Sequence, residues 1–240
     1  MTPPSPSRLF AALDATWAPA NLRDTGPWRI REGQGGGQRV SAATAISAVT
    51  ETDIALAETE MRAIGQHPLF MIRDQDSDLD QWLDAREYAI VDPVVLYLAD
   101  LADMPADTSG TYVIPSWPPL AIQANIWADA GIGPARIEVM RRSSSPKAAL
   151  LARIGDSPAG VAFVAADDDI AMLHALEVTP TCRRAGLGLA LMRHAAAWAA
   201  RGGARWLALA VTRKNTAANA LYRKIGMTEV AAYHYRKAPS

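Results

Sequence analysis

Apolar and polar positions alternate with clear periods in the second half of the chain. Runs that alternate every second residue predict strands, and apolar residues that recur every three or four positions predict helices. In chain order these patterns predict helices at about 121–130 and 134–142, strands at 148–154, 160–166 and 170–178, a helix from Gly186 to Gly202, a strand at 206–211, a helix at 215–225 and a strand at 230–236. Hairpins early and helix–strand alternation late indicate a mixed α/β sheet flanked by helices.

The first half of the chain shows a weaker version of this order. The pattern predicts a loose segment at 1–10, a hairpin of strands at 28–31 and 39–46 around Gly33–Gly37, a helix capped by Thr52, a strand at 69–73, a helix at 77–87 and a strand at 94–98. The strand–helix–strand order that ends this half repeats the order of 206–236. We therefore predict two related domains.

A stretch rich in proline separates the two halves. Residues 104–119 hold Pro105, Pro115, Pro118 and Pro119 and lack helical periodicity. Proline interrupts both helices and central strands. We therefore predict an N-terminal domain at 1–103, a linker at 104–119 and a C-terminal domain at 120–240.

Composition and charge narrow the possible partners. Lys and Arg number 24 and Asp and Glu 25, so the net charge is −1. This balance does not favour a nucleic-acid partner. The single cysteine, Cys182, excludes an intramolecular disulfide and a Cys-rich metal site. The N-terminus lacks a signal-peptide pattern, and no apolar run approaches the roughly 18 residues of a membrane span. We therefore expect a cytoplasmic protein with no membrane and no metal.

One turn carries candidate chemistry: residues Arg183–Gly188, with the sequence RRAGLG, lie between a predicted strand and a long amphipathic helix. Glycines there let the backbone approach a ligand, and the free N–H groups that begin a helix bind anions. Arg183 or Arg184 adds a charge-assisted hydrogen bond to a phosphate. A plain strand-to-helix turn, with glycine for steric relief, is the alternative.

Two other phosphate-binding motifs are excluded. A Rossmann turn needs a third glycine where Leu191 stands, and an acidic residue at the end of a following strand. A P-loop needs Gly-Lys-Ser or Gly-Lys-Thr, which neither Arg183–Gly188 nor Gly33–Gly37 supplies.

The chain around this turn resembles the GNAT family of N-acetyltransferases. The resemblance rests on three linked motifs: LHALEVTP at Leu173–Pro180, the turn Arg183–Gly188, and N-x-x-A-x-x-L-Y-x-x-x-G-M at Asn215–Met227. It covers about residues 110–240. It implies the GNAT fold, an α/β (α+β) fold with a mixed, mostly antiparallel, twisted sheet flanked by helices. The weak pattern of 1–103 resembles the degenerate N-terminal half of tandem GNAT proteins, so we expect two tandem GNAT-like domains.

The resemblance implies acetyl-CoA as cosubstrate. Backbone N–H groups from Arg184 to Leu189 would hold its pyrophosphate, and a strand edge at Leu176–Val178, splayed from the strand at 207–211, would pair with its pantetheine. The N–H of Val178 would polarise the acetyl carbonyl. The cofactor-binding residues implied are Leu176, Val178, Arg183, Arg184, Ala185, Gly186, Leu187, Gly188, Leu189 and Asn215.

Three residues are candidates for proton transfer. The resemblance implies that Tyr222 protonates the leaving thiolate; the alternative is a packed tyrosine whose hydroxyl is bonded locally. An attacking ammonium must first lose a proton, and His174 and Glu177 are the candidates that accept it. The stretch Leu-His-x-Leu-x-Val resembles serotonin N-acetyltransferase, in which a histidine at the place of His174 helps to relay the proton. The alternatives are a hydrogen-bonded core histidine and a structural buried carboxylate.

Spacing argues against joint action of this pair. His174 and Glu177 stand three apart on one predicted strand, so we expect their side chains on opposite faces of the sheet. Three other polar features are expected to be bystanders: His194 packs on a helix, Cys182 has no partner for nucleophilic chemistry, and Asp167–Asp169 forms a solvated turn rather than a cation site.

These interpretations predict an acetyl-CoA-dependent N-acetyltransferase. Its acetyl group would pass directly to a primary amine of a small molecule or peptide, without a covalent enzyme intermediate. The alternative is a non-catalytic acyl-CoA-binding module that acts as a sensor or scaffold. Residues 1–103 would carry no CoA site of their own, and would shape the acceptor cleft or bridge two sheets.

Overall fold

The computed structural model describes residues 2–104, 111–143 and 146–239. Its contacts divide the chain into two compact units. The first comprises Met1–Ala18, Leu96–Ala210 and Thr216–Val230, and the second comprises Pro19–Val95, Val211–Asn215 and Ala231–Ser240. Each unit therefore contains segments from both ends of the sequence.

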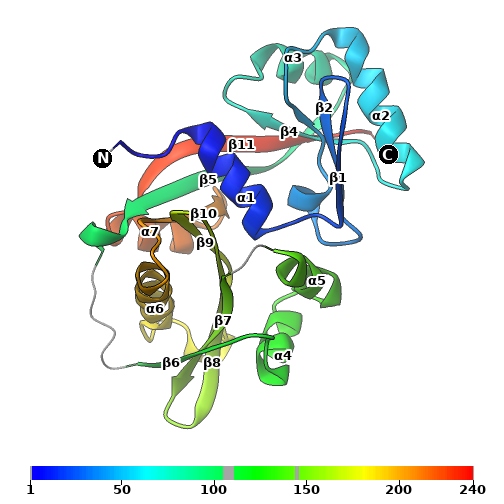
Figure 1. The fold of residues 1–240 in the computed structure, drawn as a ribbon. Helices are drawn as coiled ribbons and strands as arrows, with labels where there is room; N and C mark the ends of the chain where they lie inside the picture. The colour runs from blue at the N-terminus through cyan, green and yellow to red at the C-terminus, as the bar shows by residue number, and fades with distance from the viewer. Residues whose placement is uncertain (1, 105–110, 144–145, 240) are drawn as a thin grey trace. The chain divides into compact units, whose positions relative to one another are not determined.

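A sheet forms the centre of the first unit (Figure 1). Its strands are β6 (Tyr112–Ser116), β7 (Lys147–Ile154), β8 (Ser157–Asp167), β9 (Ile170–Val178) and β10 (Trp206–Thr212). Neighbours from β6 to β9 are antiparallel, and β9 and β10 are parallel. Apart from β6, these strands were predicted, and β9 has the predicted bounds. Strand β6 lies inside the predicted linker, whose residues 105–110 are outside the described part of the chain.

Five helices accompany this sheet in the described part of the first unit. They are α1 (Pro6–Thr16), α4 (Ala121–Asp129), α5 (Pro134–Arg142), α6 (Leu187–Arg201) and α7 (Thr216–Lys224). The interior positions of α6, such as Leu187, Leu191 and Ala195, are buried, as the helical spacing predicts. The prediction of a loose segment at 1–10 was wrong. Ser5 caps α1 by accepting a hydrogen bond from the N–H of Arg8, and Pro6 fits the first helical turn because its missing N–H is not needed there.

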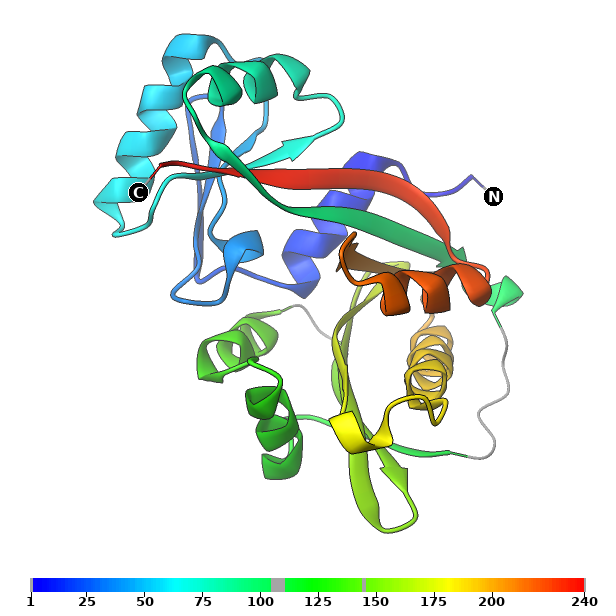
Figure 2. The same cartoon turned by 180° about the vertical axis from the view of Figure 1, so that it is seen from behind.

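Two long strands run through both units. They are β5 (Ala89–Asp100) and β11 (Thr228–Lys237). The described eight-stranded sheet has the order β4-β11-β5-β10-β9-β8-β7-β6. Figures 1 and 2 show β5 in green beside β11 in red. Strand β5 lies between β11 and β10, so the last strand of the sequence is not a neighbour of β10.

The second unit contains a small three-stranded sheet and two helices. Its elements are β1 (Asn21–Thr25), β2 (Trp28–Glu32), β3 (Thr44–Ala45), α2 (Ile54–Ala63), β4 (Leu69–Arg73) and α3 (Ser77–Ala85). The predicted hairpin pairing is present, because Trp28 pairs with Ala45, but it is short. The longer partner of β2 is β1, which was not predicted.

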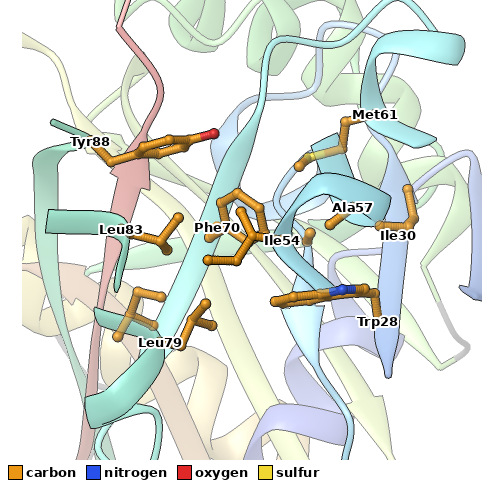
Figure 3. Close-up of a cluster of buried hydrophobic side chains, with 11 residues drawn as sticks. Trp28, Ile30, Ile54, Ala57, Met61, Phe70, Leu79, Leu83 and Tyr88 are labelled. Atoms are coloured by element: carbon orange, nitrogen blue, oxygen red, sulfur yellow. The ribbon is translucent and has the colours of Figure 1, made fainter. Parts of the chain in front are cut away.

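Buried apolar side chains fill the core of the second unit (Figure 3). The cluster comprises Trp28, Ile30, Ala43, Ile54, Ala57, Met61, Phe70, Ile72, Leu79, Leu83 and Tyr88. The rings of Trp28 and Tyr88 both meet Phe70 edge to face.

Short 3-10 turns lie in both units, at Gln38–Val40, Glu51–Asp53, Leu101–Asp103 and Pro180–Cys182. Thr50, not Thr52, forms the capping box before α2, together with Asp53.

A membrane-spanning helix is not found among the described residues, since none of their helices combines the necessary length and apolar character.

Candidate active site at the end of strand β9

Strands β9 and β10 part before either ends. Their parallel pairing joins Ile170–Leu173 to Trp206–Leu209, whereas β9 continues to Val178 and β10 to Thr212. Strand β9 remains paired with β8 as far as Val178. Main-chain N–H and C=O groups need partners, so the edge of β9 turned away from β8 is suited to an extended ligand. The predicted residues Leu176 and Val178 lie on this part of β9, and both are half-buried.

A bulge interrupts β9 at the point where it parts from β10. On β8, Phe163 pairs with His174 and Val161 pairs with Glu177. Two residues of β9, Ala175 and Leu176, therefore lie opposite one residue of β8, and Ala175 has φ 50°. A non-glycine residue with positive φ is strained, and such strain is retained where the surroundings impose it.

This bulge corrects the predicted placement of His174 and Glu177. Phe163 and Val161 are two apart on a regular strand and share one face, so their partners share that face as well. The ring of His174 stacks on that of Phe163 with centroids 6.1 Å apart. The prediction of opposite faces was wrong, because the extra residue at the bulge shifts the alternation by one position.

The chain then enters α6 through the predicted turn. Gly186 has φ 79° and ψ 0°, and Arg184 has φ 66°. Left-handed residues in such a turn direct successive N–H groups toward one side. Among the described residues no side chain caps α6, whose N-cap is Gly186. The N–H groups of its first turn lack intrahelical partners, so this end of α6 favours an anion.

The two glycines of the turn have different roles. A methyl group on Gly186 would meet nothing within 4 Å, so its left-handed backbone is what requires glycine. A methyl group on Gly188 would lie 3.2 Å from Leu221 Cδ2, so this glycine lets α6 and α7 approach closely. Arg183, Arg184 and Ala185 are exposed, whereas Leu187 is buried and Leu189 half-buried.

Tyr222 is buried on α7, and its pKa is raised. Its ring lies 5.6 Å from that of Tyr97, centroid to centroid. Burial, with smaller contributions from the charges of Glu177 and Tyr97, raises the pKa of Tyr222 to about 12. Among the described residues no group forms a hydrogen bond with its hydroxyl. A purely structural tyrosine is expected to have such a bond, and the role of Tyr222 as proton donor stays a prediction.

Glu177 is a half-buried carboxylate on the parted segment of β9. Desolvation raises the pKa of Glu177, and the positive charges of Arg183 and Arg136 oppose that effect. In the described part of the chain its carboxylate makes no hydrogen bond and no ion pair within 4 Å. A carboxyl group with a raised pKa and no fixed partner is suited to accept a proton.

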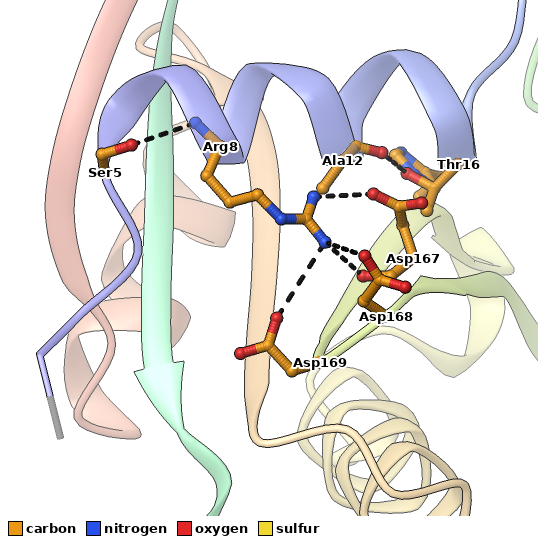
Figure 4. A network of polar contacts seen from close by, with 8 residues as sticks. Ser5, Arg8, Ala12, Thr16, Asp167, Asp168 and Asp169 are labelled. Atoms are coloured by element: carbon orange, nitrogen blue, oxygen red, sulfur yellow. Dashed lines mark hydrogen bonds and ion pairs between the residues drawn. The ribbon is translucent and has the colours of Figure 1, made fainter.

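His174 is more enclosed than Glu177. It is 5% exposed, and its ring packs against the rings of Trp17 and Phe163, which also pack against each other. Its Nε2 is 3.0 Å from Thr16 Oγ1, and the Thr16 hydroxyl donates its hydrogen to the carbonyl of Ala12 (Figure 4). Thr16 Oγ1 therefore accepts from Nε2–H, which assigns the proton to this ring nitrogen. Proton relay by His174 stays a prediction.

The other polar features noted in the sequence have local roles. The guanidinium of Arg8 binds the acidic turn, with Nη1 2.6 Å from Asp167 Oδ2 and Nη2 2.7 Å from the Asp167 carbonyl oxygen (Figure 4). Arg8 also pairs with Asp168 and Asp169 at longer distances. Asn215 lies just before α7, and its N–H donates to the carbonyl of Thr212. It belongs to the second unit, and its contact with CoA stays a prediction.

Two contributors to this region carried no signal in the sequence. Thr16 and Trp127 come from α1 and α4, which are remote in sequence from β9. Trp127 donates its indole N–H to the Ala175 carbonyl at 2.8 Å. In the described residues no group of three or more His, Cys, Asp or Glu side chains is placed to hold a metal ion.

Comparison with known proteins identifies a family domain within the chain. Residues 115–227 match the model of the acetyltransferase (GNAT) family, a family of acetyl-CoA-dependent acyltransferases. No curated protein matches the chain significantly. Among solved structures, the chain is similar to a GCN5-related N-acetyltransferase from Kribbella flavida, with a TM-score of 0.75 and 19% identity over 98% of this chain and 95% of that one.

Two further structures share the fold over most of the chain. A conserved protein of unknown function from Staphylococcus epidermidis has a TM-score of 0.68 and 12% identity, covering 95% of this chain and 97% of that one. A tandem GNAT protein from the clavulanic acid biosynthesis pathway has a TM-score of 0.61 and 13% identity, covering 95% and 87%. Residues 115–227 therefore form a domain of the GNAT family of acetyltransferases.

Proposed function

We propose that this protein transfers the acetyl group of acetyl-CoA directly to a primary amine of a small molecule or peptide. One observation carries the proposal: the edge of β9 opens after Leu173 and leads within ten residues to the turn Arg183–Gly188. An extended pantetheine fits an open strand edge, and a pyrophosphate fits the start of an uncapped helix. The fold supplies both features on consecutive segments of chain.

The residues of the turn have distinct proposed roles. Main-chain N–H groups from Arg184 to Leu189 bind the pyrophosphate, with Gly186 providing the left-handed backbone. Arg183 and Arg184 are exposed and add positive charge. Asn215 contacts the CoA arm. The N–H of Val178 polarises the thioester carbonyl, and this interaction strengthens as negative charge develops on the oxygen.

Proton transfer completes the proposed reaction. The attacking amine must be neutral, so Glu177 accepts a proton from the ammonium form. The amine nitrogen then forms a bond to the acetyl carbon, the carbon–sulfur bond breaks, and the sulfur leaves with its electron pair. Tyr222 donates its phenolic proton to that sulfur, since its raised pKa keeps the phenol protonated at neutral pH, and the resulting phenolate then accepts the surplus proton of the acetylated nitrogen. His174 is buried and bonded to Thr16, so it is a less direct acceptor for the proton of the ammonium group.

The proposal is tested by mixing the purified protein with acetyl-CoA and a panel of primary amines. We expect thiol release that depends on both the protein and an amine, and an acetylated amine detected by mass spectrometry. Binding of CoA without turnover on any amine would instead favour the non-catalytic sensor or scaffold module. Absence of both binding and turnover would exclude both functions.

A further inference from the structure

The carbonyl of Ala175 at the bulge of β9 is held by a side chain from another element. The indole Nε1 of Trp127, on α4, donates to it at 2.8 Å. Ala175 has φ 50°, a left-handed conformation that is unfavourable for an L-residue with a Cβ atom. A hydrogen bond to this carbonyl therefore stabilises a backbone conformation that Ala175 does not prefer.

Trp127 is a rigid donor. Its side chain has 0% exposure, so neighbouring atoms hold the ring on all sides. Its own carbonyl accepts hydrogen bonds from the N–H groups of Ala130 and Ile132, at the end of α4. Both the backbone and the ring of Trp127 are therefore fixed, and α4 contacts both β8 and β9.

The bulge determines how the following residues are presented. Because Ala175 and Leu176 share one position opposite β8, every residue after them changes face relative to a regular strand. The main-chain amide groups of Leu176–Val178 therefore also point in other directions than they would in a regular strand. In a regular strand the side chain of Glu177 would lie on the other face of the sheet. The amide groups that now face the open edge of β9 would then point away from it.

We infer that Trp127 is a positioning residue: its indole N–H fixes the Ala175 carbonyl and so directs the amides of Leu176–Val178 and the carboxylate of Glu177. This inference rests on the proposed function, in which those groups hold the thioester and accept the proton. Trp127 does not touch the substrate and acts through the backbone of β9. A displacement of about 1 Å at reacting groups lowers rates by about 100-fold, so a small relaxation of the bulge is measurable.

A matched pair of tryptophans makes the test specific. Trp28 is also 0% exposed, and its Nε1 donates to the carbonyl of Asp53 at 2.9 Å, but it lies in the core of the second unit. Trp127→Phe and Trp28→Phe each lose one buried N–H bond and a similar volume. A third variant with benzothienylalanine at position 127 keeps the bicyclic shape and lacks only the donor.

The expected result is a fall in kcat of about tenfold or more in both position-127 variants, with KM for acetyl-CoA changed less than about threefold. Trp28→Phe is expected to lower the melting temperature without changing kcat. Hydrogen exchange is expected to accelerate at Leu176–Val178 in the position-127 variants and to stay unchanged there in Trp28→Phe.

Unchanged kcat and unchanged exchange in the benzothienylalanine variant would overturn the inference. If the natural protein neither bound nor acetylated, the proposed function would fail by itself. The exchange measurement would then still decide whether Trp127 holds the bulge, because that measurement needs no activity.

Discussion

Burial keeps the phenol of Tyr222 protonated, and its hydroxyl has no hydrogen-bond partner among the described residues. Tyr222→Phe therefore removes a proton donor without breaking an internal bond. We expect kcat to fall by about 100-fold or more, as is typical when a general acid is lost. The melting temperature is expected to stay within about 2 °C of the natural protein, since the substitution keeps the buried ring and breaks no internal hydrogen bond. Steady-state kinetics and calorimetric unfolding measure the two quantities; a large loss of stability with intact kcat would identify a structural tyrosine.

Glu177 is expected to determine the acidic limb of the pH profile. Its pKa lies above the ordinary value of 4.5, and only the ionised form accepts a proton. The rate should therefore rise with pH through a pKa above 4.5. Deprotonation of Tyr222, near pH 12, should not limit the rate at working pH. In Glu177→Gln the limb should disappear along with most of the activity. Retention of the same limb would assign it to another group.

The raised pKa of Glu177 also predicts how the stability of the protein depends on pH. A carboxyl group whose pKa is raised on folding binds its proton more tightly in the folded state, so its contribution to stability falls as pH rises from 4.5 through the raised pKa. Glu177→Gln should therefore be more stable than the natural protein at pH 8, and this advantage should vanish below about pH 4. Thermal melts at both pH values test this; an advantage that does not depend on pH would contradict it.

At the scale of elements, Arg8 attaches α1 to the turn between β8 and β9. Its two nitrogens bind Asp167 at 2.6 and 2.7 Å, and its side chain is 28% exposed. Arg8→Ala should lower stability by about 1 kcal/mol, or about 2–4 °C in melting temperature. Arg153 is a matched control, since it is equally exposed and pairs locally with the fully exposed Asp156. Arg153→Ala should cost less; an equal loss in both would mean that Arg8 does not hold α1.

The elements near the site were largely predictable because their apolar residues recur with the spacing of a helix or a strand. Strand β9 and helix α5 have their predicted bounds, and the turn at Arg183–Gly188 begins a helix as expected. Helix α1 was missed because Pro and Ser at its start were interpreted as a loose segment, although Ser5 before Pro6 is a regular cap pattern. The bulge was not predictable, because an alanine with positive φ leaves no mark in the sequence. The bond between Trp127 and Ala175 spans 48 positions, which no local pattern indicates.

At the scale of the whole molecule, each of the two units is built from strands and helices that are separated in the sequence by parts of the other unit. Leu9 and Leu13 of α1 are buried in the first unit, and the end of β5 lies in its sheet. A division of the sequence at residues 103 and 120 separates these parts from β7–β10. The order β4-β11-β5-β10 could not be foreseen, since it depends on pairings between segments more than 100 residues apart, which period and propensity do not encode.

This organisation predicts that residues 104–240 alone do not fold stably. The fragment lacks α1 and β5, which bury apolar residues in the first unit. We expect no cooperative thermal transition by circular dichroism, whereas the full chain should show one. A fragment that melts cooperatively near the temperature of the full chain would contradict this and support the predicted domain division.

The most direct test of the central claim is calorimetric titration of coenzyme A into the natural protein, Gly186→Ala and Gly155→Ala. Both glycines have positive φ, and a methyl group added at either would meet open space, so the backbone strain is similar, but Gly155 lies in the turn between β7 and β8. We predict one coenzyme A per natural chain, binding at least about tenfold weaker in Gly186→Ala, and unchanged binding in Gly155→Ala. No binding heat in the natural protein, or equal affinity in both variants, would contradict the assignment of the Arg183–Gly188 turn to the pyrophosphate.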